Sequence, residues 1–441
     1  GGGMSLFRAS LAAEKAVFAM NSATNGNGGG LYFRNSNVLL KSVILVSNQA
    51  ENGGAVSVKT SDLEITRALL VANSALRGGA LHSLDSKCLH DRVKYIDNTA
   101  MNPELEGAGG GLYLDMSSFT SRYDPSDDYA LENALNVMKV KQLQVDHQLS
   151  VLYEAGQVLA VSKAEYANYA KSAVVNVLHA QKLATKRNED QATVDAINMQ
   201  LAEAQSALQK AEADVYELRN LDLRSYAYNN DIPSLHTNLD FKTNFAENRA
   251  DKGGAMYARN SLVDGTSEQA LISMKGNNAS IQGGGLSTEC MDAYKMNISN
   301  VLIESNYADT LGGGGVYSKG GALGCDVSFE AISVKDNVGG TSGARGGGIF
   351  LSELSTSLRN VHFAGNEATR GGGLFVQGGS TSVSSVSVKN NRAAKDGAGF
   401  YVSFGASISM NNIEMYENRA LKGGGGGLFV DSANQVSVVD S

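Results

Sequence analysis

FAENRADKGGAM at Phe245–Met256 returns as FAGNEATRGGGL at Phe363–Leu374 and as YENRALKGGGGGL at Tyr416–Leu428. Each copy contains Asn-X-Ala, a few polar residues, a Gly-Gly-(Gly/Ala) triplet and then a large apolar residue. A repeat this short indicates a stack of similar coils rather than a globule built around one buried site.

The asparagine of this phrase recurs eleven times along the chain. Outside the long gap from Asn98 to Asn248, successive copies are 25 to 31 residues apart, and Ala follows two residues later in ten copies and Gly339 in the other. Fixed spacing with small insertions is typical of a solenoid whose coils vary at one corner. We expect these side chains to form a structural ladder that is hydrogen-bonded from coil to coil. Its members are Asn21, Asn48, Asn73, Asn98, Asn248, Asn277, Asn306, Asn337, Asn366, Asn391 and Asn418.

Each coil also contains short strand-like segments. An apolar run such as Leu374–Val376 follows the glycines, and an alternating run such as Val383–Val388 comes later. These runs are rich in branched residues and close to period two, which predicts strands. The fold class is therefore all-β, a right-handed parallel β-helix of about 11 coils. Neighbouring coils about 4.8 Å apart would stack into a rod of roughly 50 Å.

The glycine triplets have two interpretations. The third position is always Gly or Ala, so we expect a larger side chain there to strike the next coil, while the other glycines supply the positive φ of a corner. The alternative is a phosphate-binding loop. The triplets recur in every copy without a following helix or a Lys-Ser/Thr pair, so corners are favoured.

One stretch breaks the repeat. Residues 124–222 contain a single glycine, Gly156, whereas the rest of the chain contains 49, and apolar residues there fall at heptad spacing. This pattern predicts an inserted α-helical coiled coil or small bundle of two or three helices. The predicted organisation is a β-helix over 1–123, the helical insertion over 124–222, a return loop over 223–240, and the rest of the β-helix over 241–441.

Composition narrows the possible partners. A net charge of −8 argues against nucleic acid, and the absence of a run of 18 apolar residues argues against a membrane span. Cys88, Cys290 and Cys325 have no zinc-motif spacing, and we expect no cofactor or metal. Cys290 and Cys325 are a little over one coil apart, so a disulfide across a corner and two free thiols both remain open.

An enzyme is the alternative function, because many polysaccharide-cleaving enzymes are parallel β-helices. Such a site needs carboxylates clustered with a basic side chain on one face. The sequence offers two candidate sets of catalytic residues. One is Asp326 with Glu330 and Asp336, and the other is Asp85 with Asp91 and Arg92. Neither set repeats at matching positions of adjacent coils, so a solvated acidic surface is favoured and no catalytic residue is assigned. Asn278 and Asn297 begin Asn-X-Ser sequons and are candidate glycosylation sites.

The pairing of F-x-x-N at Phe245–Asn248 and Phe363–Asn366 with G-G-(A/G)-(I/L/M) resembles the repeats of chlamydial polymorphic outer-membrane proteins and similar large β-helical surface proteins. The resemblance covers all but about 124–240 and implies a secreted or surface-displayed adhesin. We therefore expect a non-enzymatic structural or adhesive protein, extracellular or on a cell surface. Because both termini cut through a repeat, we expect a segment of a longer rod. Its partners would be further copies or neighbouring structural proteins, bound through end coils and the helical arm, with glycans as another candidate ligand.

Overall fold

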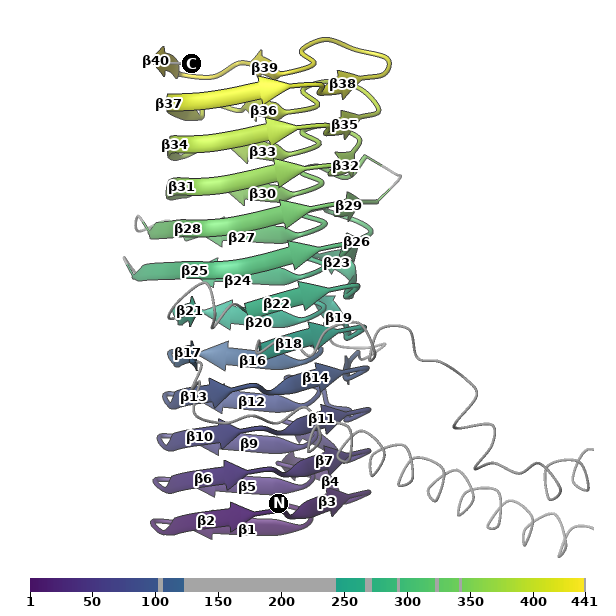
Figure 1. Ribbon diagram of the computed structural model, residues 1–441, viewed down its shortest axis with the longest axis vertical. Helices are drawn as coiled ribbons and strands as arrows, with labels where there is room; N and C mark the ends of the chain where they lie inside the picture. Colours follow the sequence, from purple (N-terminus) through teal and green to yellow (C-terminus); the bar gives the residue numbers. More distant parts are fainter. Residues whose placement is uncertain are drawn as a thin grey trace, which may run out of the picture. The chain divides into compact units, whose positions relative to one another are not determined.

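The computed structural model describes 1–101, 106–122, 243–265, 272–291, 294–321, 325–340 and 343–439. These residues form forty β-strands and no helix, and they belong to one compact unit. Every strand pair is parallel, and each strand bonds to its equivalents one coil before and one coil after (Figure 1). The fold is a parallel β-solenoid of about 11 turns, which confirms the predicted class.

The strands that follow the glycine triplets form a twelve-stranded sheet (Figure 1). They are β1 (Met4–Phe7), β5 (Leu31–Arg34), β9 (Val56–Lys59), β12 (Leu81–Leu84), β16 (Leu112–Asp115), β20 (Met256–Arg259), β24 (Leu286–Cys290), β27 (Val316–Gly320), β30 (Ile349–Ser352), β33 (Leu374–Gln377), β36 (Phe400–Ser403) and β39 (Leu428–Asp431). Their first residues are in register from coil to coil, for example Leu286 with Val316 and Val316 with Ile349. These three side chains are fully buried, so this column forms one interior ladder of the core.

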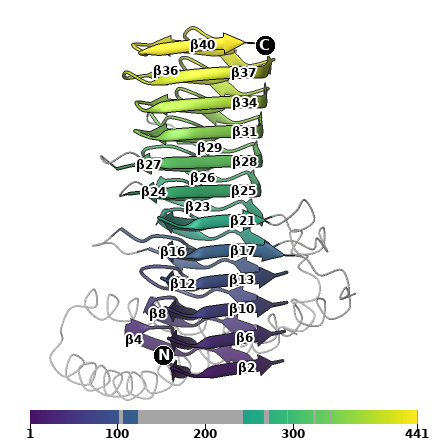
Figure 2. The same ribbon diagram turned by 90° about the vertical axis from the view of Figure 1, so that its left-hand side faces the viewer.

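The second sheet has eighteen strands (Figure 2). Six coils contribute two strands each: β2 (Ser10–Glu14) and β3 (Val17–Ala19), β6 (Asn37–Lys41) and β7 (Ile44–Val46), β10 (Asp62–Thr66) and β11 (Leu69–Val71), β13 (Lys87–Asp91) and β14 (Lys94–Ile96), β17 (Ser118–Arg122) and β18 (Thr243–Ala246), β21 (Leu262–Gly265) and β22 (Ile272–Lys275). The later coils contribute one strand each: β25 (Lys295–Glu304), β28 (Asp326–Lys335), β31 (Ser355–Ala364), β34 (Ser380–Lys389), β37 (Ser407–Tyr416) and β40 (Gln435–Val439).

The third side of each coil is shorter. It consists of an eight-stranded sheet and a separate pair of strands. The eight are β15 (Thr99–Ala100), β19 (Arg249–Lys252), β23 (Asn278–Gln282), β26 (Tyr307–Ala308), β29 (Val338–Gly339), β32 (Glu367–Ala368), β35 (Arg392–Ala393) and β38 (Arg419–Ala420), and the pair is β4 (Ser22–Asn27) with β8 (Gln49–Asn52). Alternate residues of the strands point inward, and one continuous cluster of Leu, Val, Ile, Phe and Met side chains fills the solenoid.

The glycine triplets turn a corner, and all three of their positions are sterically limited. Gly253, first in its triplet, has φ +63° and a Cβ there would lie 2.1 Å from the Met256 carbonyl oxygen. Gly254, second, would place a Cβ 2.3 Å from the Gly284 oxygen in the next coil. At Gly285, third in the following triplet, the nearest atom would be 2.9 Å away. At other third positions the Cβ would lie as close as 2.3 Å to the next coil, as at Gly399, so this position is limited to glycine or, in several coils, alanine. The first position differs because it also requires a positive φ.

β17 and β18 are separated in sequence by residues 123–242, at a corner that most other coils close with a single residue. β13 pairs with β17 and β14 pairs with β18, so the whole segment occupies the place of Arg92. Arg92 and its equivalents Ser42, Arg67 and Asn300 have φ between +52° and +53°. The predicted helical insertion (124–222) and return loop (223–240) lie outside the described residues. Within the described ranges, no helical segment has the length and apolarity to cross a bilayer.

Candidate functional site

The asparagine column is a continuous hydrogen-bonded ladder. Asn306 is typical, because its Nδ2 donates to Asn337 Oδ1 at 2.9 Å and to the Met274 carbonyl of an earlier coil at 2.9 Å. Its Oδ1 accepts from both the backbone N–H and the Nδ2 of Asn277, each at 2.9 Å. Both amide protons and the amide oxygen are therefore occupied.

The ladder continues across the interruption of the repeat. Asn98 Nδ2 donates to Asn248 Oδ1 at 2.9 Å, although the two residues are 150 positions apart in sequence. The backbone N–H of Asn98 reaches the same oxygen at 3.0 Å. Both asparagines are fully buried. Because every polar atom of these side chains is used within the solenoid, the column holds coils together and offers nothing to a ligand.

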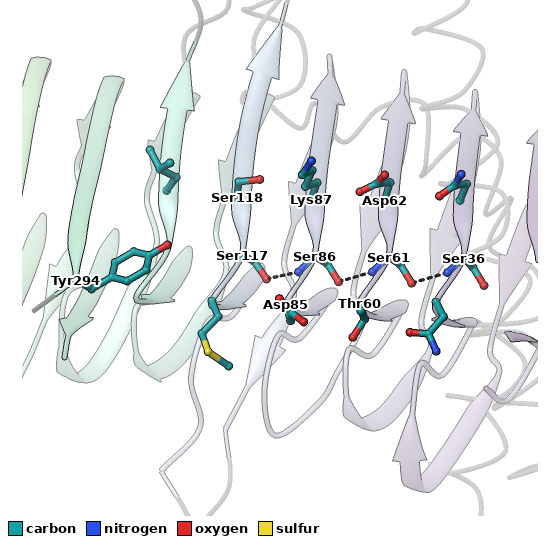
Figure 3. Close-up of a pocket in the computed structure, with 14 residues that line it drawn as sticks. Ser36, Thr60, Ser61, Asp62, Asp85, Ser86, Lys87, Ser117, Ser118 and Tyr294 are labelled. Carbon is teal, nitrogen blue, oxygen red and sulfur yellow. Dashed lines mark hydrogen bonds between the residues drawn. The ribbon is translucent and has the colours of Figure 1, made fainter. Parts of the chain in front are cut away.

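A hollow of about 410 Å³ lies along the corner between the first and second sheets (Figure 3). We call it the corner groove. Asp62, Lys87 and Ser118, the first residues of successive strands, form one rim, and the preceding corner residues, including Thr60 and Asp85, form the other. Met116, Leu262 and Tyr294 close one end with apolar surface.

A column of serines forms the floor of the corner groove (Figure 3). The backbone N–H of Ser36 donates to Ser61 Oγ at 3.0 Å, and that of Ser61 donates to Ser86 Oγ at 3.1 Å. The next links run from Ser86 to Ser117 Oγ at 3.2 Å and from Ser117 to Ser261 Oγ at 3.1 Å. This second ladder was not recognised from the sequence, although Ser36, Ser61 and Ser86 recur every 25 residues.

The serine hydroxyls are not arranged for nucleophilic catalysis. Ser61 Oγ donates to the Lys59 carbonyl at 2.8 Å and Ser86 Oγ donates to the Leu84 carbonyl at 2.8 Å. An activated serine needs its proton directed at a base, usually a histidine, and the described lining of the corner groove contains none. The groove can offer hydrogen bonds to a polar ligand, but its serines hold the corner together.

The structure does not bring together either set of candidate catalytic residues. Asp85 lies at the corner before β13 and Asp91 is the last residue of that strand, whose extended backbone spans about 13 Å. Asp91 instead forms a buried ion pair with Arg92, with Oδ2 and Nη2 2.8 Å apart. Asp326 and Glu330 are exposed on β28, and Asp336 follows the far end of that strand, beyond the corner at Ala331 (φ +53°).

The remaining sequence candidates fall into different places. Cys290 and Cys325 form a disulfide between neighbouring coils, with their Cα atoms 5.8 Å apart, while Cys88 is free and buried. Asn278 is exposed, and Asn297 is partly buried and accepts a hydrogen bond from Ser328 at 2.8 Å. Among the described residues, no group of three or more His, Cys, Asp or Glu side chains is placed to hold a metal ion.

A column of aromatic side chains follows the outer face of the twelve-stranded sheet, at the second position of each strand. His82 and Tyr113 stack with ring centroids 5.1 Å apart, Tyr113 and Tyr257 at 5.0 Å, and Phe375 and Tyr401 at 4.8 Å. We call it the aromatic column. The sequence does not reveal this column, because no single residue type repeats at the position, where Tyr, Phe, His and Ser all occur. Its full membership is Ser5, Tyr32, Ser57, His82, Tyr113, Tyr257, Ser287, Tyr317, Phe350, Phe375, Tyr401 and Phe429.

Comparison with protein-family models, with curated proteins and with solved structures finds no match to this chain. Only the geometry of its own residues therefore bears on function.

Proposed function

We propose that this chain is a non-enzymatic structural and adhesive protein, a segment of an extracellular rod. The observation that carries the proposal is the unbroken asparagine ladder, in which Asn21 bonds to Asn48, Asn98 to Asn248 and Asn391 to Asn418. A ladder in which every coil is tied to the next resists bending and local unwinding. Such stiffness suits a spacer, and it is more than a single catalytic pocket requires.

Three further predictions belong to this proposal. The coils run right-handed, as parallel crossover connections nearly always do. The heptad pattern of 124–222 forms a helical arm that contacts neighbouring molecules. The likeness of the repeat to that of chlamydial polymorphic outer-membrane proteins supports a surface location.

Self-association is supported by the chemistry of the last coil. Val430 is 43% exposed, whereas Val402, its register partner one coil earlier, is fully buried. Val438 on β40 is 48% exposed. An apolar surface of this kind beside unpaired strand edges binds other strands. We infer that another copy of the chain covers this end.

Light scattering on the chain tests the assembly. We expect association at micromolar concentration, and we expect Val430→Lys with Val438→Lys to abolish it by placing charges on the end coil. Leu39→Lys is the control, because Leu39 is 38% exposed on β6 away from that end. A monomer at every concentration, or equal loss of association in the control, would contradict the proposal. That outcome would favour the carbohydrate-binding or carbohydrate-cleaving alternative.

A further inference from the structure

Two coils between the ends of the aromatic column carry a serine instead of a ring, at Ser57 and at Ser287. The space beside these two serines is filled differently. At Ser287, Gln282 lies almost wholly buried and its Nε2 donates to Ser287 Oγ at 3.1 Å. At Ser57 the residue five positions earlier is Asn52, which is one methylene shorter. Its Nδ2 donates instead to Asn27 Oδ1 at 3.0 Å, and its own Oδ1 has no partner among the described residues.

A hollow of about 340 Å³ lies over the Ser57 interruption. Tyr32, Ser57, His82 and Tyr113 form its floor, which we call the ring floor. One wall comes from the column before the glycines, Asn27, Asn52 and Arg77, and the other from the fourth strand position, including Lys59, Asp115 and Arg259. The second wall follows from the register, since Lys59 pairs with Leu84 and Asp115 with Arg259 across the coils.

The walls carry an excess of positive charge. Asp115 is paired with Arg259 through two hydrogen bonds, so this carboxylate is already neutralised. Lys59 and Arg77 are exposed, and neither forms an ion pair with a described carboxylate. The pKa of His82 is lowered to about 4 by burial and by the charges of Arg77 and Lys59, which together outweigh the opposite effect of Asp115. His82 is therefore neutral at pH 7, and the charges of both cations reach the hollow.

The ring floor decides what kind of ligand fits. His82 and Tyr113 lie within 13° of parallel and Tyr113 and Tyr257 within 14°, so these rings stack on one another. The His82 face on the Ser57 side and the Tyr32 ring have no ring stacked on them among the described residues, so the Ser57 interruption leaves space for a ring-sized group between them. A saccharide packs the C–H face of its ring on an aromatic face and bonds its polar groups to amides and a few convergent charges, which this hollow supplies. The net charge of −8 disfavours nucleic acid as the alternative ligand.

We propose that this hollow binds an acidic saccharide, with its carboxylate or sulfate group between Lys59 and Arg77 and its hydroxyl groups on Asn27 and Asn52. Guanidinium and ammonium groups from opposite walls fix an anion from two sides. This binding site would give the adhesive role proposed above a class of ligand, and its biological setting rests on that role.

Isothermal titration of the full chain with a hyaluronan tetrasaccharide tests the inference, and a chondroitin sulfate tetrasaccharide distinguishes carboxylate from sulfate recognition. We expect one site per chain for at least one of the two, with affinity falling as salt rises. The carboxyl-reduced tetrasaccharide and inorganic sulfate should each bind at least tenfold more weakly. Equal affinity for inorganic sulfate, or no binding of either acidic tetrasaccharide, would overturn the proposal.

Two variants locate the site. Lys59→Ala with Arg77→Ala removes the charges, and Ser57→Tyr fills the hollow with the side chain that this column carries at Tyr32, so each should weaken binding at least tenfold. The matched control is Lys319→Ala with Arg345→Ala, which removes cations from the same two columns where the rings are continuous. Circular dichroism checks that all variants fold. Equal weakening in the control would overturn the proposal, and none of these results alters the outcome of the light-scattering test of assembly.

Discussion

At the scale of single residues, asparagine is the one side chain that completes the ladder. Each member uses two amide protons and accepts twice at one oxygen, all within the spacing of adjacent coils. Aspartate would lose both donors and bring a buried charge, and leucine would offer neither donors nor an acceptor. Sequence revealed this column because the identity of the residue is invariant within the chain.

We expect Asn366→Leu to destabilise the solenoid by about 3 kcal/mol. The backbone N–H and the Nδ2 of Asn337 would both lose their acceptor, and the Val334 carbonyl would lose a donor. Each buried group without a partner costs about 1–3 kcal/mol. Denaturant unfolding measures the change, and hydrogen exchange at the Asn337 amide should accelerate. Asn411→Leu, at an exposed position of β37, is the control. Unchanged unfolding of Asn366→Leu would contradict a buried ladder.

His90 is an uncharged base inside the core. Its Nδ1 lies 3.2 Å from the Tyr95 hydroxyl, its ring packs edge-to-face on Phe119, and no described group bonds its Nε2. Burial lowers the pKa of His90 to about 3, against 6.5 for a free histidine. Between these values the unfolded chain binds a proton that the folded chain does not. Stability contributed by the neutral ring is therefore complete above pH 6.5 and is lost as pH falls toward 3.

Replacing His90 by leucine, the residue at the equivalent position Leu40, should reduce this acid sensitivity. The loss of stability attributable to His90 is about 1.4 kcal/mol per pH unit below pH 6.5. The melting temperature of His90→Leu should therefore fall less between pH 7 and pH 4.5 than that of the parent chain. Asn411→Leu, at an exposed position of β37, should leave the pH dependence unchanged. Identical slopes for His90→Leu and the parent would show that His90 is already charged or accessible.

At the scale of elements, the first and third glycines of a triplet have different tolerances. We expect Gly253→Ala to cost at least about 2 kcal/mol, because a Cβ at φ +63° is strained and would lie 2.1 Å from a carbonyl oxygen. Gly285→Ala should change stability by less than about 1 kcal/mol, since Ala255 occupies the same position one coil earlier. Thermal unfolding of the two variants side by side tests this, and equal losses would refute the assignment of the corner.

How far sequence predicts each element depends on how strictly its residues repeat. The glycine corners and the asparagines recur with one or two residue types, and the position after the glycines is always a large apolar residue, so their coils could be predicted. The serine ladder was harder to predict, because it spans only five coils and serine is a common residue. Its last two members, Ser117 and Ser261, are also far apart in sequence. The hollow over Ser57 depends on whether Gln282 or Asn52 reaches a neighbouring serine, a difference of one methylene. The ion pair of Asp91 with Arg92 likewise depends on side-chain direction, which spacing alone does not give.

At the scale of the whole molecule, the interruption of the repeat is compatible with an uninterrupted solenoid. β13 and β14 of one coil pair with β17 and β18 of the next, although 123–242 separate the latter two. The sheets therefore do not require the intervening residues for their register. The corner itself is one that a single residue with positive φ closes elsewhere.

We accordingly expect that replacing 123–242 by one asparagine, the residue found at Asn300, leaves the solenoid folded. Circular dichroism should keep its β signal, and hydrogen exchange should still protect the amide of Asn98, which bonds to Asn248. The same deletion closed by a single proline is a matched control, because proline cannot adopt positive φ and should destabilise the corner. Loss of β structure in the asparagine variant would show that the inserted residues are part of the folding unit.

The asparagine ladder has a direction, and this makes the solenoid chemically polar from end to end. The backbone N–H and one Nδ2 proton of each asparagine donate to the asparagine of the following coil, while the second Nδ2 proton donates to a carbonyl of the preceding coil. No described asparagine therefore donates to Asn21 Oδ1, and none accepts from the backbone N–H of Asn418 or from its second Nδ2 proton. The aligned side-chain dipoles add along the stack and polarise one another. Two such ladders are complementary only head to tail, since joining like ends would oppose donor to donor or acceptor to acceptor. Molecules that stack end to end would therefore all point the same way, as in an open filament with heterologous contacts. Stacking through two like ends, which would give a closed two-fold dimer, is excluded.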